Sequence, residues 1–429
     1  MPIIDPSTDC KLLGIVRAFT GIEDSAVIVH GRPGCHSGVF TLQALTVPQK
    51  FVNIVYSGLR EEDLTFGGEE RLRKAILNTY RILKPKLIVI AVASAAGVMG
   101  DDVQGVVSSI KDEVKTEILI LNACGYSGTE QQGYEEALEK LADFVEPAEH
   151  SEEDAVNIIG FRLDMPHSLG DLKEIIRIFK ANGIKVNAVV SFCKFVDVRR
   201  LSRASLNVCL GGDGLFLCEV LWRRFKIPYI VVPYPYGIKN TIELIEKTCK
   251  KLNKNPNNKF IERECKYISD VLNRYYTYVE GMYGSLSAVV IGEGSRAPFF
   301  AKFLREELSV STELVVARTD NYAKDALLQV DLVEPDRLKI EEILQDVDVD
   351  VIYGSSLERM LAYRKDAGLV RIFYPTIDEV IIYDRPVAGF RGVLTIVEKT
   401  LNALMRMQEF QEFRLFLERT YKQEIRSRA

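Results

Sequence analysis

The sequence has few of the patterns by which metal and nucleotide sites are usually found. Its 429 residues include four histidines, which disfavours a centre held by several imidazoles. Its eight cysteines form no C-x-x-C pair, which disfavours zinc ribbons and ferredoxin-type clusters held within one chain. A G-x-x-x-x-G-K-[ST] phosphate loop is also absent, so we expect no ATP site of that kind in this chain.

Long apolar runs and a strong charge bias are missing as well. No run reaches the ~20 residues of a membrane span, and the start, M-P-I-I-D-P-S-T-D, has no signal-peptide character. We therefore expect a cytoplasmic protein without a membrane partner. A net charge of −5 argues against nucleic acid as the main partner. If the dispersed cysteines bind metal, folding must bring distant ones together, or two chains must share the site.

Short apolar runs alternate with amphipathic helical segments along the chain. This alternation predicts parallel sheets with helices on both faces. The runs form three series: Val27–His30, Val52–Tyr56, Leu87–Val92 and Ile118–Leu121; Val156–Gly160, Lys185–Val190, Ser205–Cys209 and Tyr229–Val232; Ser287–Ile291, Glu313–Ala317, Val349–Tyr353 and Val370–Tyr374. The sequence therefore predicts an α/β fold of three Rossmann-like, doubly wound parallel-sheet domains around a central cleft.

The boundaries between these units follow from composition. The polar stretch at 146–154 reads as a linker, and a long helix over about 258–282 leads into the third series. The domains are expected at residues 1–150, 151–255 and 256–390, with a C-terminal helical extension at 391–429. The cleft between them is the default ligand site, with Gly211–Gly214 and Gly292–Arg296 among its walls.

The most informative stretch is V-I-V-H-G-R-P-G-C-H-S-G at residues 27–38. Apolar strand formers lead into a turn built from Gly31, Pro33 and Gly34, and the turn presents Cys35. We expect Cys35 to open the next helix, where free amides and the helix dipole favour a thiolate. Such a cysteine suits a soft metal centre or nucleophilic chemistry, whereas an isolated cysteine more often only fills space.

Three further residues belong to the same predicted domain. Cys10 lies 25 residues before Cys35, and Ser94 and Cys124 each follow a strand. All of them can reach one edge of the sheet, where parallel strands present their ligand-binding loops. Thiolates gathered from several loops suit an iron–sulfur cluster, which needs soft anionic ligands and limited solvent.

Other motifs give weaker alternatives. In I-G-E-G-S-R-A, Gly292 and Gly294 approach the dinucleotide fingerprint and Arg318 could suit a 2′-phosphate, which leaves a cluster-free NADP-binding protein as an alternative. The pair Asp101–Asp102 could bind magnesium, but more readily caps the helix that follows. His30, at a strand end, reads as a structural histidine rather than a base.

Segments in all three units resemble component 1 subunits of the nitrogenase superfamily. In the first unit they are C-K-L-L-G-I-V-R-A-F-T-G-I, H-G-R-P-G-C, D-L-T-F-G-G-E-E-R-L-R-K-A-I and K-P-K-L-I-V-I-A-V-A-S-A-A-G-V-M-G-D-D. The resemblance continues through I-G-F-R-L-D-M-P-H-S-L-G-D-L-K-E-I-I-R-I-F, I-Y-G-S-S-L-E-R and V-A-G-F-R-G-V. The superfamily includes catalytic nitrogenase subunits, cofactor-assembly scaffolds, dark-operative protochlorophyllide reductase and the nickel-tetrapyrrole cyclase of methanogens.

The resemblance implies an iron–sulfur cluster, 4Fe–4S or larger, at an interface with a homologous component 1 subunit, in a homodimer or a heteromer. A separate ATP-hydrolysing iron protein would reduce it. Cys10 and Cys35 match the first two cluster cysteines of the family, and the third position is Ser94 here. Cys124 is near enough in sequence to compensate, or the partner chain supplies the remaining ligands.

The resemblance is weaker where the catalytic subunits hold their metal cofactor. Cys209 falls near the cofactor cysteine, but Ala388 replaces the histidine before G-F-R-G. A molybdenum-type cofactor bound in the usual way is not expected, although another metallocofactor or a tetrapyrrole in the cleft stays open. The predicted function is a component 1 subunit that receives electrons through the interface cluster and reduces a substrate or cofactor in the cleft. The alternative is a non-catalytic scaffold for metallocluster assembly or transfer.

Overall fold

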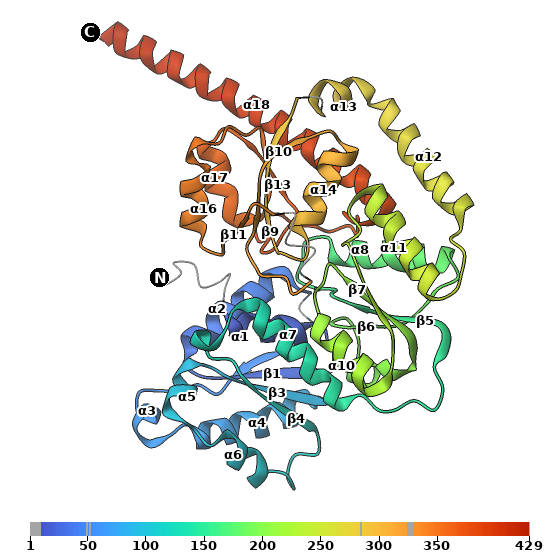
Figure 1. The fold of residues 1–429 in the computed structure, drawn as a ribbon. Helices are drawn as coiled ribbons and strands as arrows, with labels where there is room; N and C mark the ends of the chain where they lie inside the picture. Colours follow the sequence, from blue (N-terminus) through green and yellow to red (C-terminus); the bar gives the residue numbers. More distant parts are fainter. Residues whose placement is uncertain (1–9, 49, 51–52, 284, 324–329, 429) are drawn as a thin grey trace.

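The computed structural model describes residues 10–48, 50, 53–283, 285–323 and 330–428, with the side chains of 280–283 and 413–428 left aside. Its strands form three parallel sheets, of four, four and five strands. Figure 1 shows them as three bodies, the first in blue, the second in green and the third in orange. The α/β fold of three parallel-sheet units is thereby confirmed.

The first sheet has the strand order β2-β1-β3-β4. Apolar residues on one face of its strands pack against helices α4 and α6, and those on the other face pack against α1 and α7. Its strands are β1 (Ser25–His30), β2 (Ile54–Tyr56), β3 (Leu87–Val92) and β4 (Glu117–Asn122). Its helices are α1 (Lys11–Thr20), α2 (Pro33–Thr46), α3 (Asp63–Phe66), α4 (Glu69–Leu83), α5 (Ser94–Met99), α6 (Val103–Ser109), α7 (Glu130–Leu141) and the short turns η2 (Gly125–Ser127) and η3 (Ala142–Phe144). Val52, which opens a predicted strand, and the N-terminal segment 1–9 lie outside the described residues.

The second sheet has the order β6-β5-β7-β8. Its strands are β5 (Glu152–Ile159), β6 (Lys185–Val189), β7 (Ala204–Leu210) and β8 (Tyr229–Val232). Its helices are α8 (Ser168–Ala181), α9 (Phe195–Arg199), η4 (Leu201–Arg203), α10 (Leu215–Phe225) and α11 (Gly237–Lys251). The predicted linker is wrong in its last three residues: β5 already begins at Glu152, which pairs with Ala204 of β7.

The third sheet has the order β11-β10-β9-β12-β13. Its strands are β9 (Ser287–Gly292), β10 (Ser311–Ala317), β11 (Leu332–Val333), β12 (Val351–Gly354) and β13 (Gly368–Arg371), and its helices are α14 (Ala297–Glu307), α16 (Arg337–Ile343), η5 (Leu344–Asp346), η6 (Ser356–Glu358) and α17 (Arg359–Arg364). The long helix expected before it is two helices, α12 (Asn258–Arg274) and α13 (Tyr276–Tyr283), because the helix ends at the C-cap Tyr275.

Helix α1 is the element that joins the first unit to the others. All ten of its residues are buried, and it lies alongside α7 (Figure 1). Glycines let the two backbones approach: a Cβ at Gly14 would lie 1.9 Å from the carbonyl oxygen of Glu130, and one at Gly133 would lie 2.2 Å from that of Lys11. A larger residue at either position would push the helices apart.

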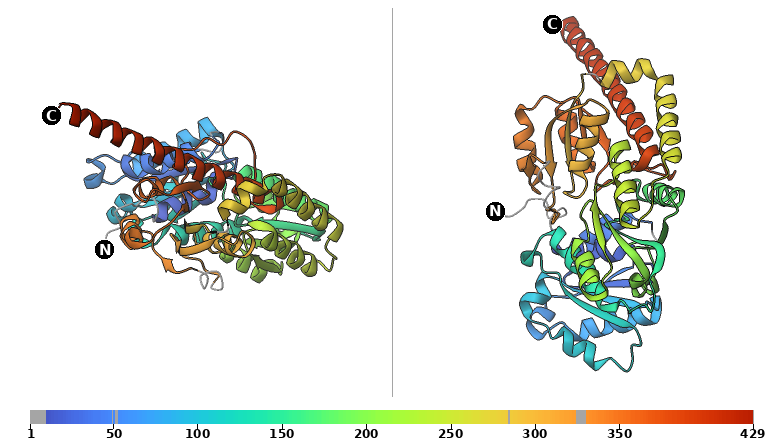
Figure 2. Two further views of the ribbon diagram at one scale, coloured as in Figure 1. Left: turned by 90° about the horizontal axis from the view of Figure 1, so that it is seen from above. Right: turned by 45° about the vertical axis from the view of Figure 1, so that its right-hand side comes forward.

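Helix α18 (Gly389–Arg428) is a single 40-residue helix. Its first part packs against α8, α11, α12 and β13, and its last part extends beyond the third unit, as both views in Figure 2 show. None of the described helices is long and apolar enough to cross a membrane.

Candidate cluster site and the domain junction

Cys10 and Ser94 both lie beside Gly125 at the carboxyl edge of the first sheet. Cys10 is the N-cap residue of α1, and Ser94 is the first residue of α5. The Ser94 hydroxyl oxygen accepts a hydrogen bond from the amide of Gly125 at 3.1 Å. A Cβ built on Gly125 would lie 3.6 Å from the Cys10 sulfur and 3.8 Å from the Ser94 hydroxyl. The bare face of Gly125 is therefore bordered by a thiol and a hydroxyl from two other segments.

Cys35 lies in the first turn of α2 and is exposed. The pKa of its thiol is raised, first because the sulfur is partly buried and second because the Cys10 thiol lies within electrostatic reach. The pKa of Cys35 is therefore raised overall, against the lowering expected from its place at the helix start, although a backbone hydrogen bond at Cys35 acts in the lowering direction. A cation beside the sulfur would favour the thiolate form.

Cys124 is placed differently. Only 2% of it is exposed, and its thiol hydrogen-bonds the carbonyl oxygen of Val92 at 3.6 Å. A Cβ at Gly97 would lie 2.4 Å from the Cys124 sulfur, so this sulfur fills the space beneath α5. The structure holds Cys124 as a packed side chain next to the site.

The fit of these side chains to an iron–sulfur cluster can be judged from the donors present. Within the described part of the chain, no three His, Cys, Asp or Glu side chains are placed to hold a metal ion. Cys10 and Cys35 are two thiols, whereas a 4Fe–4S cluster is held by about four thiolates. One chain therefore offers half of such a ligand set, and a second chain would complete it.

The surface beside Cys35 has the character of a protein interface. Helix α2, P-G-C-H-S-G-V-F-T-L-Q-A-L-T, carries no charged residue, yet most of it is exposed. Phe40 and Leu45 are exposed apolar side chains, and among the described residues a Cβ built on Gly34 or Gly38 would meet no atom within 4 Å beyond its chain neighbours and the backbone of its own helix. His36 stacks on Tyr56 with ring centres 4.6 Å apart. Exposed apolar surface of this kind marks sites of protein association.

Arg17, on α1, binds carboxylates from all three units. Its guanidinium donates to both oxygens of Asp164, at 2.6 and 3.0 Å, and to Glu130 at 3.2 Å. Its Nη2 lies 3.8 Å from an oxygen of Glu293, and the guanidinium stacks on Tyr374 with 3.8 Å between its carbon and the ring centre. The exposed fraction of the Arg17 side chain is 2%. The first, second and third units are thus joined by one buried cation.

A second buried arginine extends this network. Arg162 donates to Asp213 at 2.7 Å and to Glu130 at 2.9 Å, and stacks on Tyr134. Asp213 also accepts a hydrogen bond from the Ser295 hydroxyl at 2.8 Å. The charge of Arg162 helps to hold the pKa of the Asp213 carboxyl below its usual range, against the effect of burial. The ionic network therefore continues into the third unit.

The loops that were expected to wall a ligand cleft instead touch each other. A Cβ at Gly211 would lie 2.1 Å from the carbonyl oxygen of Ser295, and the amide of Asn321 donates to the carbonyls of Gly211 and Gly294 at 2.7 and 3.0 Å. A cavity beside Arg17 and Tyr374 has a volume of about 10 Å³, enough for one water molecule. The two loops expected among the walls of the cleft are therefore packed against each other at Gly211 and Gly294.

Cys209 and Ala388 lie in separate packed environments. The Cys209 thiol is fully buried, donates to the carbonyl oxygen of Asp213 at 3.2 Å and is paired with the thiol of Cys218, which raises its pKa. The amide of Ala388 donates to Asp171 at 2.8 Å. Because these surroundings are filled by the chain itself, they do not fit a metallocofactor or a tetrapyrrole held between Cys209 and Ala388.

The residues of the weaker alternatives have protein partners. Both ring nitrogens of buried His30 are hydrogen-bonded, to Asp101 and to Ser57, each at 2.9 Å. Asp102 caps α6 by accepting from the Gly105 amide at 2.8 Å. Arg318 is ion-paired with buried Glu358. His30 thus has the surroundings of a structural histidine, and the Arg318 guanidinium is already engaged and does not face an open nucleotide site.

The sequence did not point to two features of this site. The Arg17 network joins residues far apart in the chain, and no local pattern indicates their contact. The visible signal in the sequence was Arg17 itself, a charged residue inside an apolar helix segment. Gly125 was visible only as one glycine of the N-A-C-G-Y-S-G loop. Its position facing Cys10 and Ser94 depends on the tertiary fold.

Fold and site together define a three-unit α/β protein that presents cysteine thiols at an uncharged surface and closes its central junction with buried ion pairs. The chain matches the family described as Nitrogenase component 1 type Oxidoreductase over residues 10–405, and it belongs to that family.

Relatives with different names are similar to this chain. The nitrogenase molybdenum-iron protein beta chain of Methanococcus maripaludis is 25% identical, over 96% of this chain and 97% of the relative. The B subunit of the light-independent protochlorophyllide reductase of Heliobacterium modesticaldum is 26% identical, over 92% and 78%. The nitrogenase iron-molybdenum cofactor biosynthesis protein NifE of Clostridium pasteurianum is 24% identical, over 83% and 79%. The solved structure "Nitrogenase Cp1 at pH 6.5" superposes with a TM-score of 0.80 at 20% identity, over 95% of this chain and 94% of that one, which shows the shared fold.

Proposed function

We propose that this chain is a component 1 subunit that supplies Cys10 and Cys35 to an iron–sulfur cluster shared with a homologous subunit. The observation that carries the proposal is the open face of Gly125, which Cys10 and Ser94 border, next to the exposed Cys35 on an uncharged helix. Family membership supports the kind of cofactor. The two thiols of one chain suit a site that a second chain completes.

Each part of the site has a role in this proposal. Cys10 and Cys35 bind as thiolates, and Ser94 orients the Gly125 amide unless it loses its proton and binds as well. The partner subunit covers α2 and excludes water from the shared site. The bound cluster would supply one-electron transfer between an ATP-hydrolysing iron protein and a substrate or cofactor site. A separate iron protein fits a sequence that has no phosphate loop.

The packed junction bears on where reduction takes place. Because the Gly211–Gly214 and Gly292–Arg296 loops touch, a substrate the size of a tetrapyrrole has no place between them. We therefore assign the reduced substrate or cofactor to a site outside this junction, on the partner subunit or at the shared interface. The names of two relatives, a nitrogenase beta chain and one subunit of a reductase, support a role as one chain of a larger protein.

A scaffold for metallocluster assembly is the second candidate, because NifE is named as a cofactor biosynthesis protein. The two functions differ in their products. Reduction of a small substrate with the cognate iron protein and ATP supports the enzyme subunit. Transfer of iron and sulfide to an apo-protein, without turnover, supports the scaffold.

The cluster is tested by iron and acid-labile sulfide analysis with EPR spectroscopy on protein purified without oxygen. We expect about two irons per chain if two chains share one four-iron cluster. Cys10→Ala and Cys35→Ala should each lose the iron and the brown chromophore. Cys265→Ala, a partly exposed cysteine on α12, is the control and should keep both.

The same measurements can contradict the proposal. If Cys35→Ala retains the iron of the native protein, Cys35 is not a ligand. Full iron loss in Cys265→Ala would show that the losses come from folding rather than from ligation. Four or more irons per chain would require a larger cluster or a second centre.

A further inference from the structure

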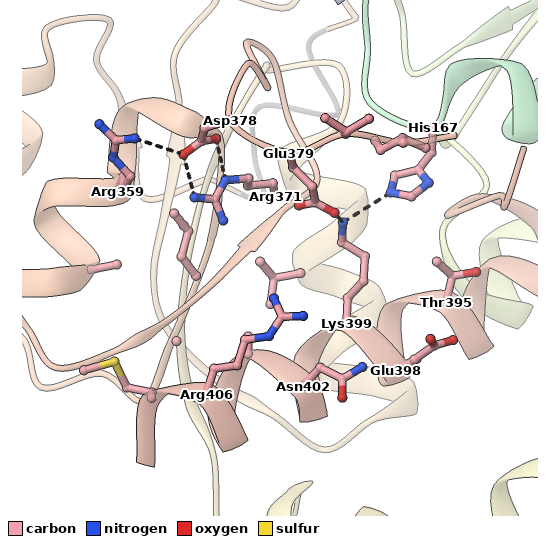
Figure 3. Close-up of a pocket in the computed structure, with 18 of the residues that line it drawn as sticks. His167, Arg359, Arg371, Asp378, Glu379, Thr395, Glu398, Lys399, Asn402 and Arg406 are labelled. Carbon is pink, nitrogen blue, oxygen red and sulfur yellow. Dashed lines mark hydrogen bonds and ion pairs between the residues drawn. The ribbon is translucent and has the colours of Figure 1, made fainter. Parts of the chain in front are cut away.

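A large cavity lies away from the cysteines, between the third unit and helix α18. Its volume is about 640 Å³, within the usual range for small-molecule sites. His167 of the second unit, Arg371 and Glu379 of the third, and Lys399 and Arg406 of α18 line it, as Figure 3 shows. Cavities between structural units are common ligand sites, and neither the proposed cluster nor the junction network uses this one.

The cavity has more positive than negative charge. Its lining contains five cations and three anions: Arg359, Arg371, Arg385, Lys399 and Arg406 against Asp378, Glu379 and Glu398. Arg359 and Arg371 share Asp378, and Arg385 pairs with Glu398 at the rim. The excess of two positive charges is notable in a chain whose net charge is −5.

The Lys399 ammonium at the centre of the cavity is held in place by hydrogen bonds to two neighbouring side chains. The Lys399 ammonium donates to Glu379 and to the Nε2 of His167, the latter at 3.3 Å. The Nδ1 of His167 lies 2.8 Å from the carbonyl oxygen of Arg385, so this nitrogen carries the proton and donates. Burial and the nearby Lys399 charge lower the pKa of His167 to about 4, so the ring is neutral at pH 7. Lys399 therefore faces the cavity from a fixed position.

Arg406 lines the cavity from α18, and among the described residues no carboxylate pairs with it. In Figure 3 its guanidinium rises from α18 toward Arg371 and Lys399, and no dashed line reaches it. The charges of Arg371 and Arg406 contribute to a lowered pKa of Lys399, after the effect of burial. An anion placed among these three cations would relieve their mutual repulsion.

Part of the remaining wall is apolar. Tyr363 and Phe410 line the cavity and contact each other with ring centres 5.5 Å apart. The segment between β13 and α18 also lines it, and there Val380, Ile382 and Tyr383 are 86%, 82% and 75% exposed. These residues line the cavity and also face solvent. Burying these exposed apolar side chains against an apolar ligand body would contribute favourably to the free energy of binding.

We propose that this cavity binds an organic anion that has one carboxylate or similar acid group and an apolar or aromatic body. The acid group would lie against Arg406, with Arg371 and Lys399 nearby. The body would lie against the Tyr363–Phe410 pair and the Val380–Tyr383 segment. The inference stands on side chains of this chain alone and is independent of the proposed cluster.

The test is isothermal titration calorimetry of the full chain with three probes. 1-Naphthoate has both the acid group and the aromatic body, 1-naphthalenemethanol has the body alone, and inorganic phosphate has the charge alone. We expect saturable binding of naphthoate, weaker at high salt, and at least tenfold weaker binding of the other two. Arg406→Gln should weaken naphthoate binding at least tenfold, and Ile382→Ser should weaken it several-fold.

Two controls separate this site from binding elsewhere. Arg406 and Ile382 are exposed, so neither variant removes a buried contact of the fold, and unchanged circular dichroism and melting should confirm this. Arg223→Gln removes an exposed arginine on α10, outside the cavity, and should bind naphthoate as the native chain does. Absence of saturable binding would overturn the inference. So would equal binding by Arg406→Gln and Arg223→Gln, or binding of the neutral probe as tight as that of naphthoate.

Discussion

Removal of Arg17 tests whether buried charges hold the three units together. Arg17→Ala deletes a guanidinium that contacts Asp164, Glu130 and Glu293 and stacks on Tyr374. At the junction, three arginines face four carboxylates: Arg17, Arg162 and Arg296 against Glu130, Asp164, Asp213 and Glu293. The variant leaves two cations for the same carboxylates, all buried.

The expected cost follows from that imbalance. Breaking a buried ion pair by removing one partner costs about 3–5 kcal/mol, because the remaining charge is left without compensation. The Arg17 side chain is 2% exposed, so water does not replace its hydrogen bonds. In a chain of this size, we expect the melting temperature to fall by roughly 3–6 °C. Arg17→Met with Asp164→Asn should recover part of the loss, since it removes a charge of each sign.

Differential scanning calorimetry of the native chain and of the variants measures this effect. Arg73→Ala is the control, because Arg73 pairs with Glu113 at the surface, where a pair contributes about 1 kcal/mol or less. A fall in the melting temperature of Arg17→Ala no larger than that of Arg73→Ala would refute the reasoning. So would a double variant less stable than Arg17→Ala alone.

Three further predictions concern the site and its surroundings. Gly125→Ala should keep the native melting temperature, because the new methyl meets its neighbours at 3.6 and 3.8 Å, yet it should lower the iron content per chain by filling the face bordered by Cys10. Unchanged iron content would place the cluster elsewhere. Gly97→Ala, whose methyl would lie 2.4 Å from a neighbouring sulfur, should instead have a lower melting temperature. Gly38→Glu should gain up to roughly 0.5 kcal/mol of helix stability in the isolated chain while weakening subunit association in sedimentation velocity; association at native strength would exclude α2 from the interface. Burial and the Asp213 charge raise the pKa of Glu135 to about 8, above its value in the unfolded chain. Between these two pKa values the folded state holds a proton that the unfolded state has lost. The free energy of unfolding should therefore decrease as the pH rises from about 5 to about 8. Urea unfolding of Glu135→Gln across this range should lack that slope, and a slope equal to that of the native chain would contradict the assignment.

The fold could be predicted from the sequence because its strands are short apolar runs buried on both faces. Strand β3 begins and ends where its pattern predicts, at Leu87–Val92. The prediction failed where local composition and tertiary pairing disagree. Residues 152–154 are polar, yet Glu152 joins β5 because it pairs with β7. The two residues of β11 are too few to produce a pattern.

The candidate site could be predicted only in part, for a related reason. Cys35 and Ser94 follow the apolar runs Val27–His30 and Leu87–Val92, and loops after parallel strands share one edge of the sheet. Cys10 precedes the first strand, and its assignment as a ligand came from the family resemblance. The state of each thiol depends on packing that the sequence does not display: Cys124 is buried against Gly97, while Cys35 is exposed. Likewise, glycine-rich loops such as Gly211–Gly214 suggested an open cleft. They serve instead for close contact between units, because a glycine accepts a neighbouring backbone as readily as a ligand.

Helix α1 gives Cys10 and Cys35 unequal structural support in the proposed site. Cys10 caps its start, and Arg17, seven residues further, holds it to the second and third units, roughly 10 Å along a helix that is buried throughout. The position of Cys10 is therefore fixed by the whole three-unit body before any partner binds. Cys35 has less support, because α2 leaves most of its residues exposed and is held by the buried side chains of Val39 and Gln43, of which Gln43 donates to Asp164 at 3.1 Å. It follows that Cys10 is the more firmly preorganised of the two ligands of the proposed cluster, and that subunit association should have its larger effect on the position of Cys35.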